Sequence, residues 1–237
     1  MCIGHFPFLP TPDDAEYLQW STSNNASNKQ FFPSMVKYMD KKIGEIVAHI
    51  DSLGITNNTI IIFTGDNGCP RGIHSEFDDV IVTGGKHSTN EPGTNVPLLI
   101  QWPKETAGKR VSDRLIDFTD FLPTIADMTG IPAPGNYGIL DGKSFYDVIT
   151  WEQASTAKRT WIYDAFNSDP AEPNRRWQNW VQDRSYKLYE SEKPLINGRF
   201  VKITKGLPDS SPLNDEDLSP DEKKIKRKFQ DVLESFH

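Results

Sequence analysis

The spacing of apolar residues predicts a helix followed by a buried strand in the first third of the chain. After Pro33, apolar residues recur at intervals of four and three, which places them on one helical face, and Gly54 supplies a stop. Asn57 and Asn58 then turn the chain into an apolar strand over residues 59–64. A helix, a short turn and a buried strand form half of an α/β crossover unit. The helical face consists of Met35, Met39, Ile43, Ile46, Ile50 and Leu53.

A second strand and a second helix follow. Residues 96–102 read as another buried strand. A helix is predicted over residues 120–129, with Thr119 as its cap and Gly130 as its terminator. Residues 132–141 contain prolines and glycines and read as a linker or loop. The apolar face of this helix would consist of Phe121, Leu122, Ile125 and Met128.

The pattern changes beyond about residue 150. Short aromatic or β-branched runs separated by polar turns predict a small antiparallel sheet. Ser219, Pro220 and Glu222 then form a helix start, with Ser as cap, Pro at the first position and Glu completing a capping box. We therefore divide the chain into residues 1–150 and a smaller unit over residues 151–237. The runs are residues 160–166, 177–183, 186–190 and 199–203, and the helix stripe is Ile225, Phe229, Val232, Leu233 and Phe236.

Composition restricts the possible partners. The net charge of −7 argues against nucleic acid as the main partner, because no dense basic surface is present. The basic run at residues 223–228 is balanced by nearby carboxylates and reads as a solvated helix face. No apolar stretch approaches the length of a membrane span, and the first residues show no signal peptide. Cys2 and Cys69 allow at most one disulfide, and free thiols are the preferred interpretation.

Two polar side chains come directly after the first predicted strand. Its apolar run at residues 60–63 is followed by Thr-Gly and then by Asp66 and Asn67. Side chains at the end of a buried strand lie at the edge of an α/β sheet, where ligands usually bind. Their oxygens suit a divalent cation, although Ca²⁺ takes about 6–8 oxygen ligands and this pair supplies only part of such a shell. An Asp-Asn-Gly turn without a ligand is the alternative interpretation.

Lys86 and His5 are the other candidates for chemistry. Lys86 follows two glycines, Gly84 and Gly85, so the backbone there could approach a ligand closely, and its ammonium could bind sulfate or phosphate oxygens. A mobile surface loop is the alternative. His5 could donate to an anion or protonate a leaving group, although a lone histidine near a terminus is more often neither. The sequence contains no phosphate-binding loop, no serine-hydrolase elbow and no recognised pair of metal-binding histidines.

Several motifs in order resemble the type I, arylsulfatase-like sulfatases of the alkaline phosphatase superfamily. They run along nearly the whole chain, so the ordered set is far more specific than any one motif. The resemblance implies the C-terminal half of an alkaline-phosphatase-like α/β sandwich domain, plus a small antiparallel sheet with a C-terminal helix. The matching segments are residues 5–12 (His-Phe-Pro-Phe-Leu-Pro-Thr-Pro), 38–44, 63–68 (Phe-Thr-Gly-Asp-Asn-Gly), 84–86 (Gly-Gly-Lys), 91–103, 117–124, 140–142 and 184–188.

The resemblance also assigns roles to the candidate residues. Asp66 and Asn67 would be two ligands of the family's Ca²⁺, and Lys86 would bind the sulfate. His5 would contact the sulfate or the leaving-group side. The chain departs from the family pattern at His87, where glycine is usual, and at Asn95, where arginine is common. These departures concern the shape of the loop and leave Lys86 in place.

The resemblance further implies a formylglycine nucleophile, which this chain lacks. The family makes it from a Cys-x-Pro/Ala-x-Arg motif, and neither Cys2 nor Cys69 lies in one. The paired aspartates that complete the family's calcium site are also absent, since Asp13-Asp14 and Asp78-Asp79 do not follow a strand at the chain start. We therefore interpret the chain as a C-terminal portion with an incomplete calcium site and no useful activity alone.

The parent activity implied by the resemblance is hydrolysis of a sulfate ester, carried by a sulfated glycan or an aryl sulfate. A periplasmic or extracellular location is suggested by the resemblance only. Two alternatives stay open. The chain could derive from a phosphodiesterase or phosphonate hydrolase of the same superfamily, because a metal and a lysine suit phosphate as well. It could also be a non-catalytic binding module.

Overall fold

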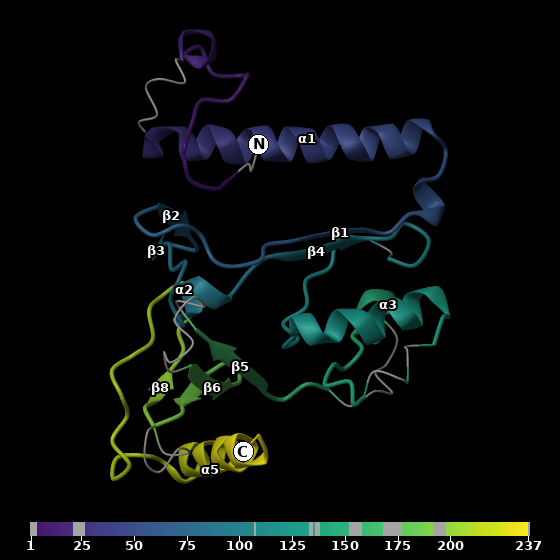
Figure 1. The fold of residues 1–237 in the computed structure, drawn as a ribbon. Helices are drawn as coiled ribbons and strands as arrows, with labels where there is room; N and C mark the ends of the chain where they lie inside the picture. Colours follow the sequence, from purple (N-terminus) through teal and green to yellow (C-terminus); the bar gives the residue numbers. More distant parts are fainter. Residues whose placement is uncertain are drawn as a thin grey trace. The chain divides into compact units, whose positions relative to one another are not determined.

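The structure of the 237-residue chain is a computed structural model, which describes residues 4–20, 27–106, 108–132, 135, 138–151, 158–167, 177–191 and 198–236 (Figure 1). The helices are α1 (Phe32–Ser52), α2 (Glu91–Thr94), α3 (Phe121–Thr129), α4 (Tyr146–Thr150) and α5 (Pro220–Ser235). The strands are β1 (Ile61–Thr64), β2 (His74–Phe77), β3 (Val80–Thr83), β4 (Leu98–Gln101), β5 (Ile162–Phe166), β6 (Gln178–Gln182), β7 (Tyr186–Tyr189) and β8 (Phe200–Lys202). Short 3-10 helices occupy Tyr17–Gln19, Lys29–Phe31, Thr56–Asn58 and Phe118–Asp120.

The chain forms two compact units, and each is discontinuous in sequence. The first unit consists of Met1–Ser88 and Pro92–Lys104. The second consists of Thr89–Glu91 and Glu105–His237. The predicted domain division at residue 150 stays a prediction. In the described part of the chain, no helix is long and apolar enough to cross a membrane.

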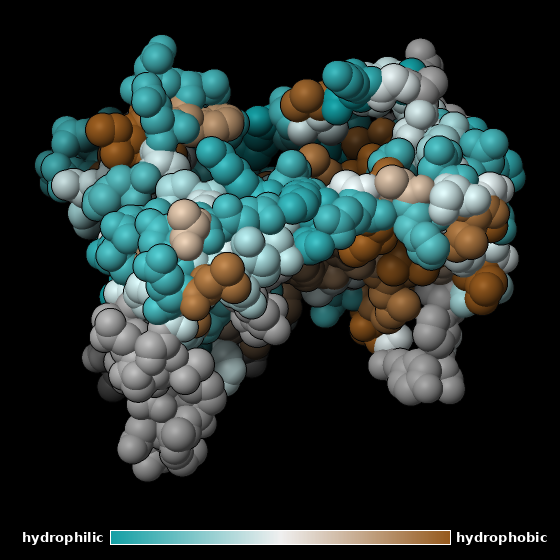
Figure 2. Space-filling model, turned by 90° about the horizontal axis from the view of Figure 1, so that it is seen from above, coloured by the Kyte–Doolittle hydropathy of each residue, from teal (hydrophilic) through white to brown (hydrophobic). Residues whose placement is uncertain are grey.

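The first unit contains α1 and two antiparallel strand pairs. The predicted helix and both predicted strands are confirmed: β1 pairs with β4, with Ile62 opposite Ile100. The predicted burial of the two strands is wrong, and the apolar face of α1 is only partly buried. Met35 is 1% exposed, but Ile46 on the same helix is 59% exposed. Every residue of β1 is half-buried, and Leu99 of β4 is 58% exposed. Figure 2 shows hydrophobic residues in brown on the surface, beside hydrophilic ones.

The sequence did not indicate the hairpin formed by β2 and β3. Its two turn residues, Asp78 and Asp79, have φ angles of +48° and +62°. Two consecutive left-handed residues match the twist of the flanking strands, and aspartate is among the residues that accept this conformation. The two aspartates therefore form the turn. The sequence signal for the strand was the run of four β-branched residues, Val80, Ile81, Val82 and Thr83.

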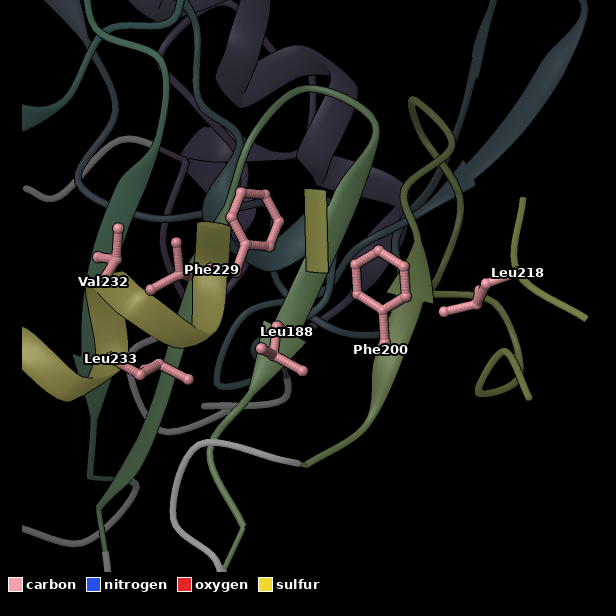
Figure 3. Close-up of a cluster of buried hydrophobic side chains, with 7 residues drawn as sticks. Leu188, Phe200, Leu218, Phe229, Val232 and Leu233 are labelled. Atoms are coloured by element: carbon pink, nitrogen blue, oxygen red, sulfur yellow. The ribbon is translucent and has the colours of Figure 1, made fainter. Parts of the chain in front are cut away.

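The second unit contains a four-stranded antiparallel sheet in the order β5-β6-β7-β8, covered by α5. This confirms the sheet and helix predicted from the sequence. Figure 3 shows α5 side chains pointing toward those of β7 and β8, and Phe229, Leu233 and Leu188 are 0% exposed. Burial of this apolar cluster is the main source of stability in the unit. The cluster consists of Val181, Leu188, Phe200, Leu218, Phe229, Val232 and Leu233.

The ends of α5 and α3 refine the predicted caps. The Ser219 hydroxyl accepts from Glu222 N, which confirms the predicted capping box. The predicted Thr119 cap of α3 is wrong, because a 3-10 helix precedes α3 and Asp117 caps that helix by accepting from Thr119 N. The left-handed Gly130 (φ +67°) ends α3 as predicted.

The basic run on α5 and the apolar face of α3 are both less uniform than their sequences indicate. Lys226 is only 7% exposed, and its Nζ lies 2.5 Å from Asp215 Oδ1, so the basic run is not wholly solvated. In α3, Leu122 and Ile125 are 45% and 46% exposed, whereas Thr124 is 1% exposed. Thr124 can be buried because its hydroxyl donates to Asp120 O at 2.6 Å.

Candidate active site

Two loops of the first unit and residues Pro92 and Gly93 of α2 are held together by backbone contacts, and we call these segments the packed loops. Gly68 N donates to Gly93 O at 2.9 Å, and Lys86 N donates to Cys69 O at 3.0 Å. A Cβ atom on Gly68 would lie 1.9 Å from Pro92 O, and one on Gly84 would lie 2.1 Å from Pro70 O. Any side chain at either position would separate the loops, because real Cβ atoms do not approach a carbonyl oxygen this closely. The glycines therefore hold the segment that follows β1 against the segment that carries Lys86.

Asp66 and Asn67 lie at the start of this packed region. They follow β1 after Gly65 and precede Gly68, with Asp66 exposed and Asn67 half-buried. A carboxylate oxygen and an amide oxygen are both donor types that Ca²⁺ accepts. Within the described residues, no group of three or more His, Cys, Asp or Glu side chains could hold a metal ion. The chemistry of the donors thus fits part of a calcium site and does not complete one.

Arg71 orders the backbone around Lys86. Its Nε donates to Lys86 O at 2.8 Å, and its Nη2 donates to His87 O at 2.6 Å. Two charge-assisted bonds from one planar guanidinium fix consecutive peptide groups relative to each other. The sequence did not indicate this role, since nothing in the pattern links Arg71 to residues fifteen and sixteen positions later. The half-buried Lys86 side chain thus starts from a backbone held by both Cys69 and Arg71.

His87 adopts a backbone conformation that is uncommon for a residue with a side chain. His87 has a φ of +65°, which is the left-handed region that favours glycine. The backbone at this position therefore takes the conformation that the family's usual glycine would take easily. The hydrogen bond that Arg71 donates to the carbonyl oxygen of His87 contributes to holding the histidine in this conformation.

His5, the remaining candidate, makes no hydrogen bond to the packed loops in the part of the chain that the structure describes, whereas Cys69 belongs to these loops through its carbonyl oxygen. His5 is exposed, and its Nδ1 lies 2.6 Å from Phe6 O. Cys69 is a free, half-buried thiol, and burial raises the pKa of the Cys69 thiol above its ordinary value of 9.0. A protonated thiol is a poor nucleophile, so this environment does not activate Cys69. Cys2 lies outside the described residues.

Comparisons with known proteins identify the family of the chain. Residues 4–131 match the family model described as Sulfatase, and residues 85–204 match the one described as N-sulphoglucosamine sulphohydrolase, C-terminal. Steryl-sulfatase of Mus musculus is 32% identical over 120 residues, covering 48% of this chain and 19% of that protein. Iduronate 2-sulfatase of Mus musculus is 24% identical over 220 residues, covering 81% of this chain and 36% of that protein.

A solved structure supports the same fold. The structure of a 2-O GAG sulfatase superposes with a TM-score of 0.63 at 21% identity, covering 87% of this chain and 42% of the other. This likeness confirms the predicted alkaline-phosphatase-like α/β class. The chain spans less than half the length of each of these three proteins.

Proposed function

Because the chain belongs to the Sulfatase family, we propose that it carries one part of a site for sulfate-ester hydrolysis. In this proposal Lys86 binds the sulfate group, Asp66 and Asn67 provide two ligands to Ca²⁺, and His5 contacts the sulfate or the leaving-group side. One observation carries the proposal. The loop that follows β1 and the loop of Lys86 are bonded to each other through Lys86 N and Cys69 O at 3.0 Å.

The side chains suit the charge changes of this reaction. A sulfate ester is an anion, and the ammonium of Lys86 offsets its charge as a compact, strongly interacting cation. Positive groups held in place before the reaction also stabilise the charge that develops in the transition state. Ca²⁺, when bound, would add the Lewis acidity of a divalent cation to the same region. The exposed imidazole of His5 could donate a proton to the departing oxygen.

The chain supplies binding and charge in this proposal but no nucleophile. The pKa of the Cys69 thiol is raised by burial, so this residue stays protonated near neutral pH. We therefore propose that the purified chain does not turn over sulfate esters. Turnover of an aryl sulfate by the chain with added Ca²⁺ would contradict this part of the proposal.

The proposed substrate class is a sulfated sugar. The names iduronate 2-sulfatase and 2-O GAG sulfatase both indicate sugar substrates for those proteins. The name steryl-sulfatase makes a sulfated ring alcohol the second candidate. Both share the sulfate group, which is the only part of the substrate that Lys86 is proposed to bind.

Calorimetric titration with sulfate tests the role of Lys86. At low ionic strength, where charge interactions are least screened, we expect Lys86→Ala to weaken sulfate binding by about tenfold or more. Lys37→Ala is the control, since Lys37 is an exposed lysine of α1 in the same unit. Equal affinity of the wild-type chain and Lys86→Ala would refute the proposal, as would a wild-type chain that does not bind sulfate.

A further inference from the structure

A fully buried lysine lies in the sheet of the second unit. Lys187 of β7 is 0% exposed, although an ammonium loses much hydration when it is buried. Its Nζ donates to Thr89 O at 2.5 Å and lies 3.4 Å from Asp209 Oδ1. Burial lowers the pKa of Lys187, and attraction to Asp209 opposes that shift. The shorter of the two polar contacts of this buried ammonium is thus the hydrogen bond to Thr89 O, a backbone carbonyl outside the sheet.

Tyr189 also contacts Thr89. Its hydroxyl donates to Asp209 Oδ2 at 2.5 Å and lies 2.9 Å from Thr89 Oγ1. A phenol has one proton, and Tyr189 donates it in the hydrogen bond to Asp209. The Thr89 hydroxyl is therefore the donor in the hydrogen bond between Thr89 and Tyr189. Thr89 is thus held through both its carbonyl and its side chain. Asp209 links Lys187 and Tyr189, because one carboxylate oxygen faces each of them.

Glu91 provides a further hold two residues later. It is 9% exposed, and its Oε2 accepts from Gly206 N at 2.8 Å. Gly206 belongs to the same loop as Asp209, between β8 and α5. The tripeptide Thr89–Glu91 is consequently fixed by a buried polar network of the second unit.

The peptide on either side of this tripeptide belongs to the packed loops of the candidate site. Lys86 lies three residues before Thr89, and Gly93 lies two residues after Glu91. Gly93 O accepts from Gly68 N, and Ser88 N donates to Gly85 O, both at 2.9 Å. Fixing residues 89–91 therefore restricts the segment from Gly84 to Gly93, which carries Lys86 and the start of α2.

We propose that Lys187, Tyr189 and Asp209 are positioning residues that hold Thr89 and thereby set the conformation of the Lys86 loop. The sheet itself does not require them, since apolar residues of similar volume avoid the desolvation of a buried ion pair. Their polar atoms converge on a segment that contributes no strand to the sheet. The inference rests on the proposed role of Lys86 in binding sulfate.

Hydrogen–deuterium exchange of the full chain tests the positioning. The reporters are the amides of Lys86 and Ser88, which are bonded to Cys69 O and Gly85 O. We expect Lys187→Met and Tyr189→Phe to speed exchange of these amides by about tenfold, as fits the loss of one hydrogen bond to a charged group. Exchange of the β6 and β7 amides should change less than twofold (~0.4 kcal/mol). Sulfate binding should weaken in the same two variants.

Matched controls come from the same unit. Lys226 is also a buried lysine paired with an aspartate, and Tyr186 is also a β7 tyrosine whose hydroxyl donates to a carboxylate, Glu222, at 2.9 Å. Lys226→Met and Tyr186→Phe should leave the Lys86 and Ser88 amides unchanged. Should Lys187→Met fail to fold, Tyr189→Phe decides, because it removes a single oxygen atom.

Three outcomes would overturn the inference. The first is unchanged exchange at Lys86 and Ser88 in Tyr189→Phe. The second is faster exchange spread equally over the whole second unit, which a purely structural role predicts. The third is unchanged sulfate binding in Lys187→Met and Tyr189→Phe when Lys86→Ala abolishes it. If Lys86→Ala leaves sulfate binding unchanged, the proposed function fails, and the exchange rates still decide whether the network holds the loop.

Discussion

Replacing Asp120 by asparagine should strongly destabilise the second unit. The Asp120 side chain is 2% exposed, and Arg159, its partner, is 7% exposed. Oδ2 accepts from Asp117 N at 2.9 Å and from Arg159 Nε at 2.8 Å. Oδ1 accepts from Lys143 N at 2.6 Å and from Arg159 Nη2. In either orientation, the amide NH2 of an asparagine would face two of these donors.

The expected cost follows from the charge that is left behind. Removing one partner of a buried ion pair costs about 3–5 kcal/mol, because the remaining charge is buried without compensation. With a urea slope of about 2 kcal/mol/M, the unfolding midpoint would fall by roughly 2 M. Urea unfolding followed by tryptophan fluorescence measures this directly, since the sheet contains the buried Trp180.

An exposed pair in the same unit provides the control. Arg184 and Asp113 also form an arginine–aspartate pair, but their side chains are 56% and 84% exposed. Exposed pairs contribute about 0–1 kcal/mol, so Asp113→Asn should shift the free energy of unfolding by less than 1 kcal/mol. The reasoning is refuted if Asp120→Asn loses less than about 1 kcal/mol, or if the two variants lose equal amounts.

Two further predictions concern the candidate site. His87→Gly should raise the free energy of unfolding by up to about 1 kcal/mol, because glycine relieves the left-handed strain and loses part of that gain as backbone entropy. His74→Gly, in the exposed strand β2, should instead lower it, and a destabilised His87→Gly would contradict the prediction. Alkylation of Cys69 with iodoacetamide, followed by mass spectrometry, should rise with pH at a midpoint above 9.0, because burial raises the thiol pKa. A midpoint below 9.0 in the folded chain would show that the thiol is activated, whereas urea should restore the ordinary value.

The elements with strong periodic patterns could be predicted from the sequence. The stripe on α5 is buried mainly at Phe229, Val232 and Leu233, and the four strands of the second sheet lie where short apolar runs were separated by turns. The β2–β3 hairpin was missed because its turn consists of two aspartates, whose left-handed backbone cannot be inferred from charge. The predicted burial of β1 and β4 was wrong. An apolar run shows that a strand can be buried, but it does not show whether another part of the chain covers it.

The sequence pattern singled out three candidate site residues, whose roles stay predictions. Asp66, Asn67 and Lys86 stood out because they interrupt apolar or glycine-rich segments. Arg71 did not, because its role depends on carbonyl groups that are close only after folding. The same holds for Lys187, which lies in an aromatic strand and could equally have pointed to solvent. Residues that act through backbone atoms carry little signal in their own side-chain chemistry.

The placement of Thr89–Glu91 determines how the molecule can be dissected. The chain passes from one compact unit to the other three times, after Ser88, Glu91 and Lys104. A polypeptide of residues 105–237 would keep all four strands of the second sheet and α5 but would lack Thr89. Lys187 Nζ would then lose its bond to Thr89 O, and Gly206 N would lose its bond to the Glu91 carboxylate. An excised second unit should therefore be built with residues 89–91 retained through a linker, since no single cut separates the two units intact.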